Sequence, residues 1–293
     1  MANRFFSAFF GHADASPGKV IAFVPAFNEE NDIHVVLESL LGFKREGTID
    51  DVVVVDSRST DNTEKVAKKM GANVVKQQYG KGRGGAFVDG VKYCLKNKAE
   101  IILMFDADIV KPLKREQVQE MIAPVRESSV IAMVIYPPIE GNRGSDQSLW
   151  ESLEFSGQRA FRASSLQFLF ERKNGRLELS GSKEAADFME AAAEYALENY
   201  LNHLFDMMGR RRTGLTKAID KGRENLIALK PKNRQIDLLK GQVEQIHRST
   251  QKILELMDDP CHQAFLRRLE AGLPQKRDEQ GKNLLVRAIK RVF

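Results

Sequence analysis

Short apolar runs alternate with helical patterns along the first part of the chain. Each run has the length and the apolar character of a strand buried on both faces of a sheet; the runs lie at residues 20–24, 52–55, 74–75 and 101–105. Between them, apolar positions spaced three and four residues apart predict helices through residues 33–41, 66–70 and 88–95. This alternation predicts an α/β fold with a mostly parallel sheet between helices.

The second half of the chain has a different pattern. Residues 130–136 predict one more strand, which Pro137 and Pro138 end. From about residue 182 onward the pattern is helical almost throughout, with amphipathic stripes over residues 236–257 and 284–293. The later part of the chain is therefore expected to be helical.

These patterns divide the chain into three segments. We expect an N-terminal arm at residues 1–18, an α/β catalytic domain at 19–215 and a helical C-terminal extension at 216–293. The extension could cover the active site, form a homodimer interface or rest on a membrane. Because an amphipathic stripe is usually buried against protein, a structural or oligomeric role is the favoured interpretation.

The composition is that of a globular protein with a hydrophobic core. Of the 293 residues, 42% are hydrophobic and 29% are charged. The excess of 45 basic over 40 acidic residues gives a net charge of +5, which is too small to predict a nucleic-acid partner. Basic runs at residues 210–212, 267–268 and 290–291 predict solvated helix faces, and attraction to anionic lipid or to a phosphorylated acceptor is the alternative.

The predicted location is the cytoplasm. Cys94 and Cys261 stand far apart, without the spacing of a zinc site or a disulfide framework, which is typical of a reducing compartment. No apolar run approaches the roughly 20 residues that are needed to span a bilayer. Any contact with the inner face of the membrane is therefore expected to be peripheral.

Polar residues follow three of the predicted strands at the point where each strand ends. Asn28 and Glu29 follow the first strand, Asp56 ends the second, and Asp106 and Asp108 follow the fourth. In parallel sheets, ligands bind beyond the carboxyl ends of the strands. We therefore expect these side chains to form a ligand site at one edge of the sheet.

Asp106 and Asp108 are the strongest candidates for chemistry. Two carboxylates just past a buried strand are costly to bury unpaired. Either one alone could cap a helix, but together they predict a site for a hard divalent cation, Mg²⁺ or Mn²⁺, because these ions prefer oxygen ligands. Such a cation would offset the charge that develops on a departing diphosphate.

The loops after the first two strands have a structural and a functional interpretation each. Pro25 predicts a rigid turn out of the first strand, and by propensity alone Asn28 would cap the next helix. One residue of 59–61 is expected to cap the helix after the second strand. Asp56 is harder to explain structurally and could accept a hydrogen bond from a base or a ribose.

The glycine-rich run at residues 80–85 favours phosphate binding. Its glycines let the backbone approach a phosphate, and Lys81 supplies positive charge. The spacing differs from that of the P-loop, which argues against an ATPase of that class. A nucleotidyltransferase, which shares a similar sheet, needs a glycine-rich loop directly after the first strand, where this chain has residues 25–28 instead.

Taken in order, these elements resemble the family 2 glycosyltransferases of the GT-A fold. The motifs are Val-Pro-Ala-Phe-Asn-Glu-Glu at 24–30, Val-Asp-Ser-Arg-Ser-Thr-Asp-Asn-Thr at 55–63, Gly-Lys-Gly at 80–82 and Phe-Asp-Ala-Asp at 105–108. The resemblance covers about residues 20–113 and implies a UDP- or GDP-sugar donor. It assigns the nucleoside to Pro25, Ala26, Asn28, Glu29 and Asp56, the diphosphate to Lys81 and Gly82, the ribose or metal to Asp106, and the metal to Asp108.

A second resemblance lies in residues 156–162, Ser-Gly-Gln-Arg-Ala-Phe-Arg, and in Tyr-Pro-Pro at 136–138. Both resemble the acceptor half of soluble members akin to glucosyl-3-phosphoglycerate synthases and polyprenyl-phosphate sugar transferases. The resemblance implies that Ser156, Gly157 and Gln158 lie near the acceptor. On charge grounds, Arg159 or Arg162 could grip an acceptor phosphate through a bidentate contact, and a surface arginine on a helix is the alternative.

A weaker resemblance concerns Glu198. The segment at residues 195–198 resembles the family's Gly-x-Gly-x-Glu, which makes Glu198 a candidate for orienting the acceptor or the sugar. The residues expected to take part in catalysis are therefore Asp108, Glu198 and Arg159.

Two features depart from the family pattern. The stretch at residues 226–234, where the family usually has a metal-binding histidine, contains none; His203 or His247 could substitute, although a lone histidine on a helix is more often structural. No Glu-Asp pair follows the acceptor loop as a general base, and a phosphate acceptor, already ionised, needs none.

The sequence thus predicts metal-assisted transfer of a sugar to a phosphorylated small molecule or a lipid phosphate. A protein that keeps the fold as a nucleotide-binding scaffold, without turnover, is the alternative from another class.

Overall fold

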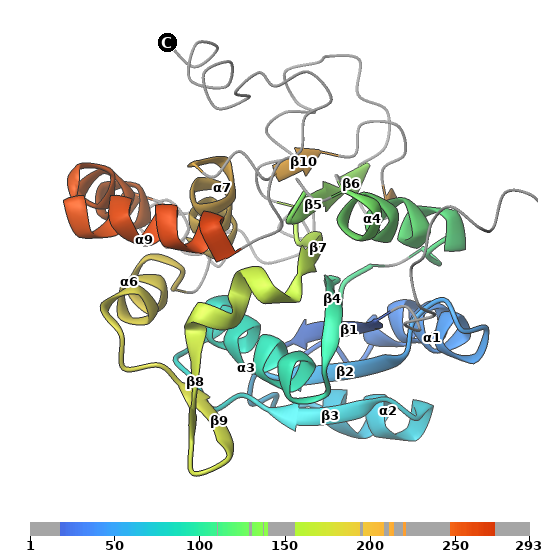
Figure 1. Ribbon diagram of the computed structural model, residues 1–293. Coiled ribbons are helices and arrows are strands. Elements are labelled where there is room, and N and C mark those ends of the chain that lie inside the picture. Colours follow the sequence, from blue (N-terminus) through green and yellow to red (C-terminus); the bar gives the residue numbers. More distant parts are fainter. Residues whose placement is uncertain are drawn as a thin grey trace, which may run out of the picture.

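A seven-stranded sheet forms the centre of the computed structural model (Figure 1), in the order β10-β5-β7-β4-β1-β2-β3. The structure describes residues 18–109, 111–128, 131–136, 138–139, 156–193, 196–207, 211–213, 219–220 and 247–272. The arm predicted at residues 1–18 thus lies outside the described residues except for Gly18, and so does the stripe at 284–293.

The first half of the sheet follows the predicted alternation. The strands β1 (Lys19–Ala26), β2 (Asp51–Asp56), β3 (Asn73–Lys76) and β4 (Ala99–Met104) pair in parallel, and the helices that link them are α1 (Ile33–Arg45), α2 (Thr63–Met70) and α3 (Gly82–Lys96). Gly71 ends α2 with a φ of 94°, a left-handed conformation that glycine adopts without a steric penalty. The predicted α/β class with a mostly parallel sheet is confirmed.

The valine run of β2 shows why these strands are apolar throughout. Val53 and Val55 belong to a core cluster with α3, whereas Val52 and Val54 belong to a second cluster with α1, on the other face of the sheet. Since successive side chains of a strand point to opposite faces, a strand covered on both sides must be apolar at every position.

Residues 158–162 form a strand, not a helix. This strand, β7 (Gln158–Arg162), runs antiparallel between β4 and β5 (Met133–Tyr136), while α4 (Arg115–Glu127) packs against β5 and β7. The suggestion that Arg159 and Arg162 lie on a helix surface is therefore wrong. The sequence pattern did not predict this strand, because it contains two arginines at positions where a buried strand usually has apolar residues. Both arginines can lie in the strand because they donate hydrogen bonds to backbone carbonyls that only the folded chain brings near.

The segment between β7 and the helical part has no element that the sequence pattern predicted. A 3-10 helix, η1 (Ala163–Leu169), leads into a hairpin of β8 (Phe170–Lys173) and β9 (Arg176–Leu179), after which α6 (Lys183–Ala191) and α7 (Leu197–Met207) begin the helical part.

The expectation that the chain is helical almost throughout after residue 182 is wrong in two places. The strand β10 (Arg211–Thr213) pairs in parallel with β5, and β11 (Ile219–Asp220) pairs in parallel with β6 (Pro138–Ile139). The edge of β5 offers unpaired backbone groups that a neighbouring strand can satisfy. Of the basic run at 210–212, the last two residues thus lie in a strand rather than on a helix face.

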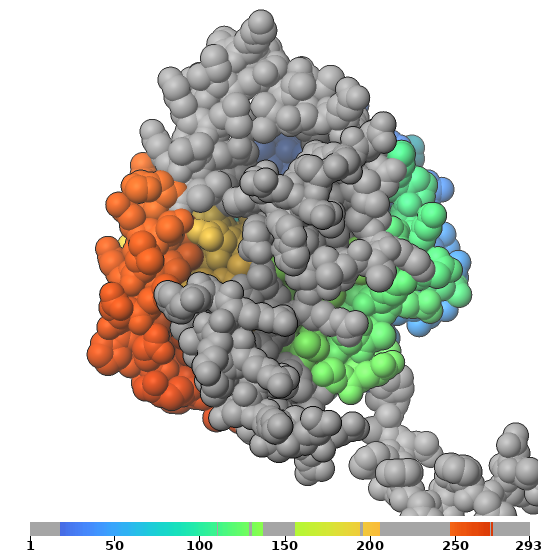
Figure 2. Space-filling model, turned by 90° about the horizontal axis from the view of Figure 1, so that it is seen from above, coloured from blue at the N-terminus to red at the C-terminus, as the bar shows by residue number. Residues whose placement is uncertain are grey.

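The described part of the C-terminal extension belongs to the core. A helix at residues 247–258 and α9 (Pro260–Gly272) place Ile253, Leu256, Phe265 and Leu266 in the same buried cluster as Phe188. Figure 1 draws α9 beside α6 and α7, and Figure 2 shows its orange surface next to the gold surface of α7. None of the helices in the described part of the chain is long and apolar enough to cross a membrane.

Candidate active site

The predicted loops meet at one edge of the sheet. Ala26 lies opposite Asp56 in the pairing of β1 with β2, and Met104 lies opposite Arg159 in the pairing of β4 with β7. Since β7 is antiparallel, its amino end lies at the carboxyl ends of the parallel strands. Residues 156–158 therefore reach the loop that holds Asp106.

The loops after β1 and β2 are joined by hydrogen bonds, which we call the loop latch. Asn28 adopts a φ of 56°, its amide nitrogen donates to the Ser59 hydroxyl at 3.0 Å, and its side-chain oxygen accepts from the Thr60 amide at 2.8 Å. Because α1 begins only at Ile33, the suggestion that Asn28 caps this helix is wrong. Asn28 instead fixes one loop against the other.

The latch continues through the start of α2. The Glu29 amide donates to the Thr63 hydroxyl at 2.8 Å, and Asp61 accepts from the Thr63 amide at 2.9 Å. The N-cap of α2 is Asn62, whose side chain makes no capping bond, so the prediction that a residue of 59–61 caps this helix is wrong. Asp61 instead binds the amide of the first helical residue. Asp56 is buried and accepts from the Ser59 amide at 3.2 Å, so it shapes the same loop.

Pro25 lies inside β1 and not in a turn, which corrects the prediction. The strand continues to Ala26, with Pro25 opposite Val55 of β2. The carbonyl of Phe23 points toward β4, and Pro25, two residues on, faces the same side, beyond the last paired residue of β4. A proline is tolerated there because no partner strand needs its missing N–H.

The glycine-rich loop is held from within. The side-chain amide of Gln77 donates to the carbonyls of Tyr79 and Gly82, each at 3.1 Å, and Asp89 accepts from the Tyr79 amide at 3.0 Å. Lys81 is exposed just before the first turn of α3. A positive side chain beside a helix N-terminus is a favourable arrangement for a phosphate.

Arg83 is the residue that sequence reasoning missed. Its guanidinium contacts the carboxylate of Asp106 and lies 2.6 Å from that of Glu198, and both carboxylates are buried. Burial alone would lower the pKa of Arg83, but the charges of Asp106, Glu198 and Asp108 raise it above its ordinary value. The sequence did contain a signal: a cation in the first turn of a helix is disfavoured by the helix dipole, which implies carboxylate partners elsewhere.

Gln158 and Gly157 complete the surroundings of Asp106. The side-chain amide of Gln158 donates to Asp106 Oδ2 at 2.7 Å, while its oxygen accepts from the Asp106 backbone amide at 2.9 Å. A Cβ on Gly157 would overlap both Arg83 and Asp106. Ser156 is buried as well and bonds the Tyr136 carbonyl. The predicted loop at 156–158 thus holds Asp106 in place.

Arg159 and Arg162 do not lie where their predicted roles require. Arg159 has no exposed surface, and its guanidinium donates to the Ser156 carbonyl and to Asn202, each at 2.8 Å. Arg162 is opposite Ile101, at the amino end of β4, and donates to backbone carbonyls such as that of Ser128 at 2.8 Å. A grip of Arg162 on an acceptor phosphate is therefore wrong, and Arg159 could act only by positioning its neighbours.

Neither candidate histidine joins the carboxylates. His203 faces His262 of α9, with 3.3 Å between their Nε2 atoms, and His247 is exposed on the helix at 247–258. Among the described residues, no group of three or more His, Cys, Asp and Glu side chains could hold a metal ion. Asp106 and Asp108 still offer the oxygen ligands that Mg²⁺ and Mn²⁺ prefer, and a nucleotide's phosphates are the usual source of others.

Comparison with known proteins now identifies the family. A sequence model described as glycosyl transferase family 2 matches residues 21–179, more than half of the chain. The chain belongs to glycosyl transferase family 2. The family and the GT-A fold inferred from the motifs are confirmed, and membership of this family sets the nucleotidyltransferase alternative aside.

Individual proteins also match parts of the chain. An uncharacterized protein of Methanocaldococcus jannaschii is 42% identical over 90 residues, 31% of this chain and 35% of that protein. UDP-N-acetylglucosamine–dolichyl-phosphate N-acetylglucosaminyltransferase of Methanococcus voltae is 30% identical over 102 residues, 29% of this chain and 39% of that enzyme. The chain thus matches about a third of the length of each of these curated relatives.

A solved structure matches over a longer stretch. Glucosyl-3-phosphoglycerate synthase from Mycobacterium tuberculosis, in complex with Mn²⁺, uridine diphosphate and glucosyl-3-phosphoglycerate, covers 80% of this chain and 80% of its own, with a TM-score of 0.59 and 20% identity. At this identity the match shows the common fold.

Proposed function

We propose that this family 2 chain transfers a sugar from a UDP- or GDP-sugar to a phosphorylated small molecule or a lipid phosphate, assisted by Mg²⁺ or Mn²⁺. The observation that carries the proposal is the meeting of Asp106, Glu198 and Arg83 at the carboxyl edge of the sheet, with the charge of Asp108 close by. The complex of the mycobacterial synthase with Mn²⁺ and uridine diphosphate supports the choice of metal and donor.

The donor would lie across three loops. The loop latch and Asp56 would hold the nucleoside. The residues that would contact it are Pro25, Ala26, Asn28 and Glu29. Lys81 and Gly82 would contact the diphosphate at the start of α3, where backbone N–H groups and the helix dipole favour negative charge. Asp106 and Asp108 would hold the cation, which neutralises charge on the departing diphosphate.

Arg83 would set the geometry on the sugar side. It pairs with both Asp106 and Glu198. Through this pairing it would position Glu198, whose proposed role is to orient the sugar or the acceptor. The loop at residues 156–158 holds Asp106 through the two hydrogen bonds of Gln158. An ionised phosphate acceptor fits a site without a strong base, because it needs no deprotonation.

Donor turnover tests the proposal. The chain is incubated with UDP- or GDP-sugars and Mn²⁺, and release of the nucleoside diphosphate is measured with and without phosphorylated acceptors. Asp108→Asn should abolish release, whereas Asp258→Asn, an exposed aspartate on the helix at 247–258, should leave it unchanged. Equal release by wild type and Asp108→Asn would refute the assignment.

Binding without turnover would favour the scaffold alternative. A nucleoside diphosphate at 100 times its dissociation constant stabilises the protein by about 2.7 kcal/mol, which a thermal-shift assay detects. A shift with Mn²⁺ and UDP or GDP, but no release from any donor, would reject the enzymatic proposal and keep the nucleotide site.

The homodimer, the cytoplasmic location and the peripheral membrane contact that the sequence predicts remain proposals.

A further inference from the structure

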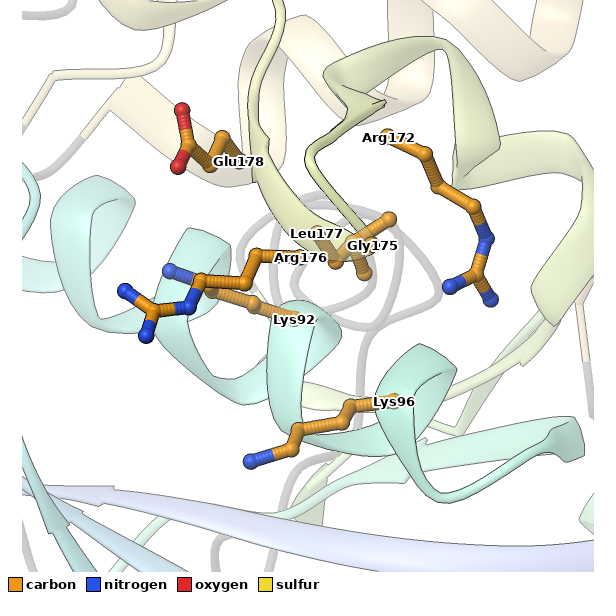
Figure 3. Close-up of a pocket in the computed structure, with 7 residues that line it drawn as sticks. All are labelled: Lys92, Lys96, Arg172, Gly175, Arg176, Leu177 and Glu178. Atoms are coloured by element: carbon orange, nitrogen blue, oxygen red, sulfur yellow. The ribbon is translucent and has the colours of Figure 1, made fainter.

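A cavity lies away from the donor loops. It has a volume of about 410 Å³ and lies between the C-terminal half of α3 and the β8–β9 hairpin, lined by charged side chains of Lys92, Lys96, Arg172, Arg176 and Glu178 (Figure 3). Since α3 begins at Gly82 and rises about 1.5 Å per residue, Lys92 is about 15 Å along the helix from the glycine-rich loop. We call this feature the basic cavity.

The charges of the basic cavity are not balanced. Four cationic residues and one acidic residue, Glu178, line it, and within the described residues Lys96, Arg172 and Arg176 form no ion pair or side-chain hydrogen bond. An adjoining cavity of about 330 Å³ shares Lys92 and Lys96. Like charges gathered around one hollow repel one another, and a bound anion relieves that repulsion.

One basic side chain, Lys92, is held in place by a neighbour, and a tight turn shapes the opposite wall. The Lys92 amine donates to the Tyr79 hydroxyl at 2.7 Å and lies 4.9 Å from the centre of its ring. On the other wall, Asn174 and Gly175 have φ values of 49° and 76°, as a tight two-residue hairpin turn requires. This turn fixes the backbone that carries Arg172 and Arg176, whose exposed side chains point apart in Figure 3.

We propose that the basic cavity is a second anion site, which binds a compound bearing more than one phosphate charge. Arginine pairs well with phosphate through two parallel N–H donors, and lysine adds a point charge. The volume is in the range of pockets for small ligands, which suits a sugar phosphate, a diphosphate or the head group of a phospholipid. The site is separate from the donor loops and does not depend on sugar transfer.

Calorimetric titration with sodium pyrophosphate, without divalent cations, tests this site. The double variant Arg172→Ala/Arg176→Ala should bind about tenfold more weakly or lose one class of sites, because two charge-assisted contacts are removed. Arg45→Ala, an exposed arginine on α1 across the sheet, is the matched control and should bind like wild type. Lys81→Ala identifies any pyrophosphate that binds at the donor loop, since that component is lost in this variant alone.

A second arm identifies the source of the phosphate. If wild type sediments with phosphatidylglycerol vesicles and the double variant does not, the ligand is a lipid head group. If neither sediments and pyrophosphate binding still depends on the two arginines, the ligand is a soluble anion. Pyrophosphate and vesicle binding equal to wild type in a double variant with normal circular dichroism would overturn the proposal. Because no transfer activity is measured, its failure is distinct from failure of the proposed function.

Discussion

Arg83 shows how one half-buried cation can organise several acids. Asp106 and Glu198 are 5% and 4% exposed, so neither carboxylate can rely on water for its charge. Arg83 supplies the compensating charge to both. Its position in the first turn of α3 ties the glycine-rich loop to the carboxylates of Asp106, which follows β4, and of Glu198 in α7.

Replacing Arg83 by methionine should lower the free energy of unfolding by about 3 kcal/mol, because it removes the cation that two buried carboxylates contact. Mn²⁺ should restore part of this stability in the variant, since the cation takes over the neutralisation. Chemical denaturation with and without Mn²⁺ measures both effects. The matched control is Arg115→Met, which removes an exposed pair with Glu46 and should cost less than about 1 kcal/mol. Equal losses in the two variants would contradict this role.

Gly157 makes the same cluster possible by having no side chain. Gly157→Ala should force Arg83 and Asp106 apart and lower the free energy of unfolding by about 2 kcal/mol, as overpacking usually does. Gly42→Ala is the control: its added carbon finds no neighbour nearer than 3.8 Å, and alanine favours a helix, so it should stabilise α1 by about 0.5–1 kcal/mol. Thermal denaturation that ranks the two variants in the opposite order would reject the steric argument.

At the scale of elements, the predictable parts are those whose signal is local. The strands β1, β2 and β4 were predicted because burial on both faces makes each of them apolar at nearly every position. The pattern failed for β7, whose Gln158 and Arg159 are buried yet polar. Their partners, Asp106 and Asn202, lie more than 40 residues away in the chain, so no window of sequence around β7 contains the reason for its burial.

The site shows the same division. Asp106, Asp108 and the loops after β1 and β2 were predicted because each follows a strand that the sequence marks clearly. The role of Asn28 was misjudged, because its partner Thr60 belongs to the next loop and only the parallel pairing of β1 with β2 brings them together. Arg83 was overlooked inside a glycine-rich run, although Glu198, a candidate from the sequence, lies beside it.

The contact between α7 and α9 should make stability depend on pH. Burial and the neighbouring His262 lower the pKa of His203 from 6.5 to about 4, and burial lowers the pKa of His262 as well. Between pH 6.5 and about pH 4, His203 is protonated in the unfolded chain but not in the folded one. The free energy of unfolding should therefore fall as the pH drops from 6.5 toward 4. For His203 the loss reaches about 3 kcal/mol at most.

Urea denaturation at pH 7 and pH 5 measures this dependence. His203→Gln should reduce it, whereas His34→Gln, an exposed histidine on α1, should preserve it. A wild-type stability that stays level over this range, or a His203→Gln variant with the full dependence, would show that the histidine pair does not act in this way.

At the scale of the whole molecule, the described C-terminal helices are part of one folding unit. Phe265 is 5% exposed and lies 5.1 Å from the ring of Phe168, in the cluster that also contains residues of β1 and α3. A helix that shares a core with the sheet should unfold together with it. The boundary predicted at residue 216 is therefore not expected to separate two independent units.

Phe265→Ala should lower the free energy of unfolding by about 3–4 kcal/mol and keep a single transition, because the cavity lies in the common core. Leu254→Ala, at a side chain that is 57% exposed, should change stability by less than about 0.5 kcal/mol. Circular dichroism during denaturation checks both. A separate early transition in the Phe265 variant would show instead that the C-terminal helices unfold on their own.

The place of β7 between β4 and β5 also sets an order of events during synthesis. As the chain leaves the ribosome, β1 to β4 can pair among themselves in the order β4-β1-β2-β3, while β5 has no neighbour in the sheet until β7 follows. Distant pairings of this kind form late, since a long loop must close first. The nascent protein is thus expected to bring the loops after β1 and β2 together early, and Asp106 meets Gln158 only after translation has passed the strand that joins the two halves.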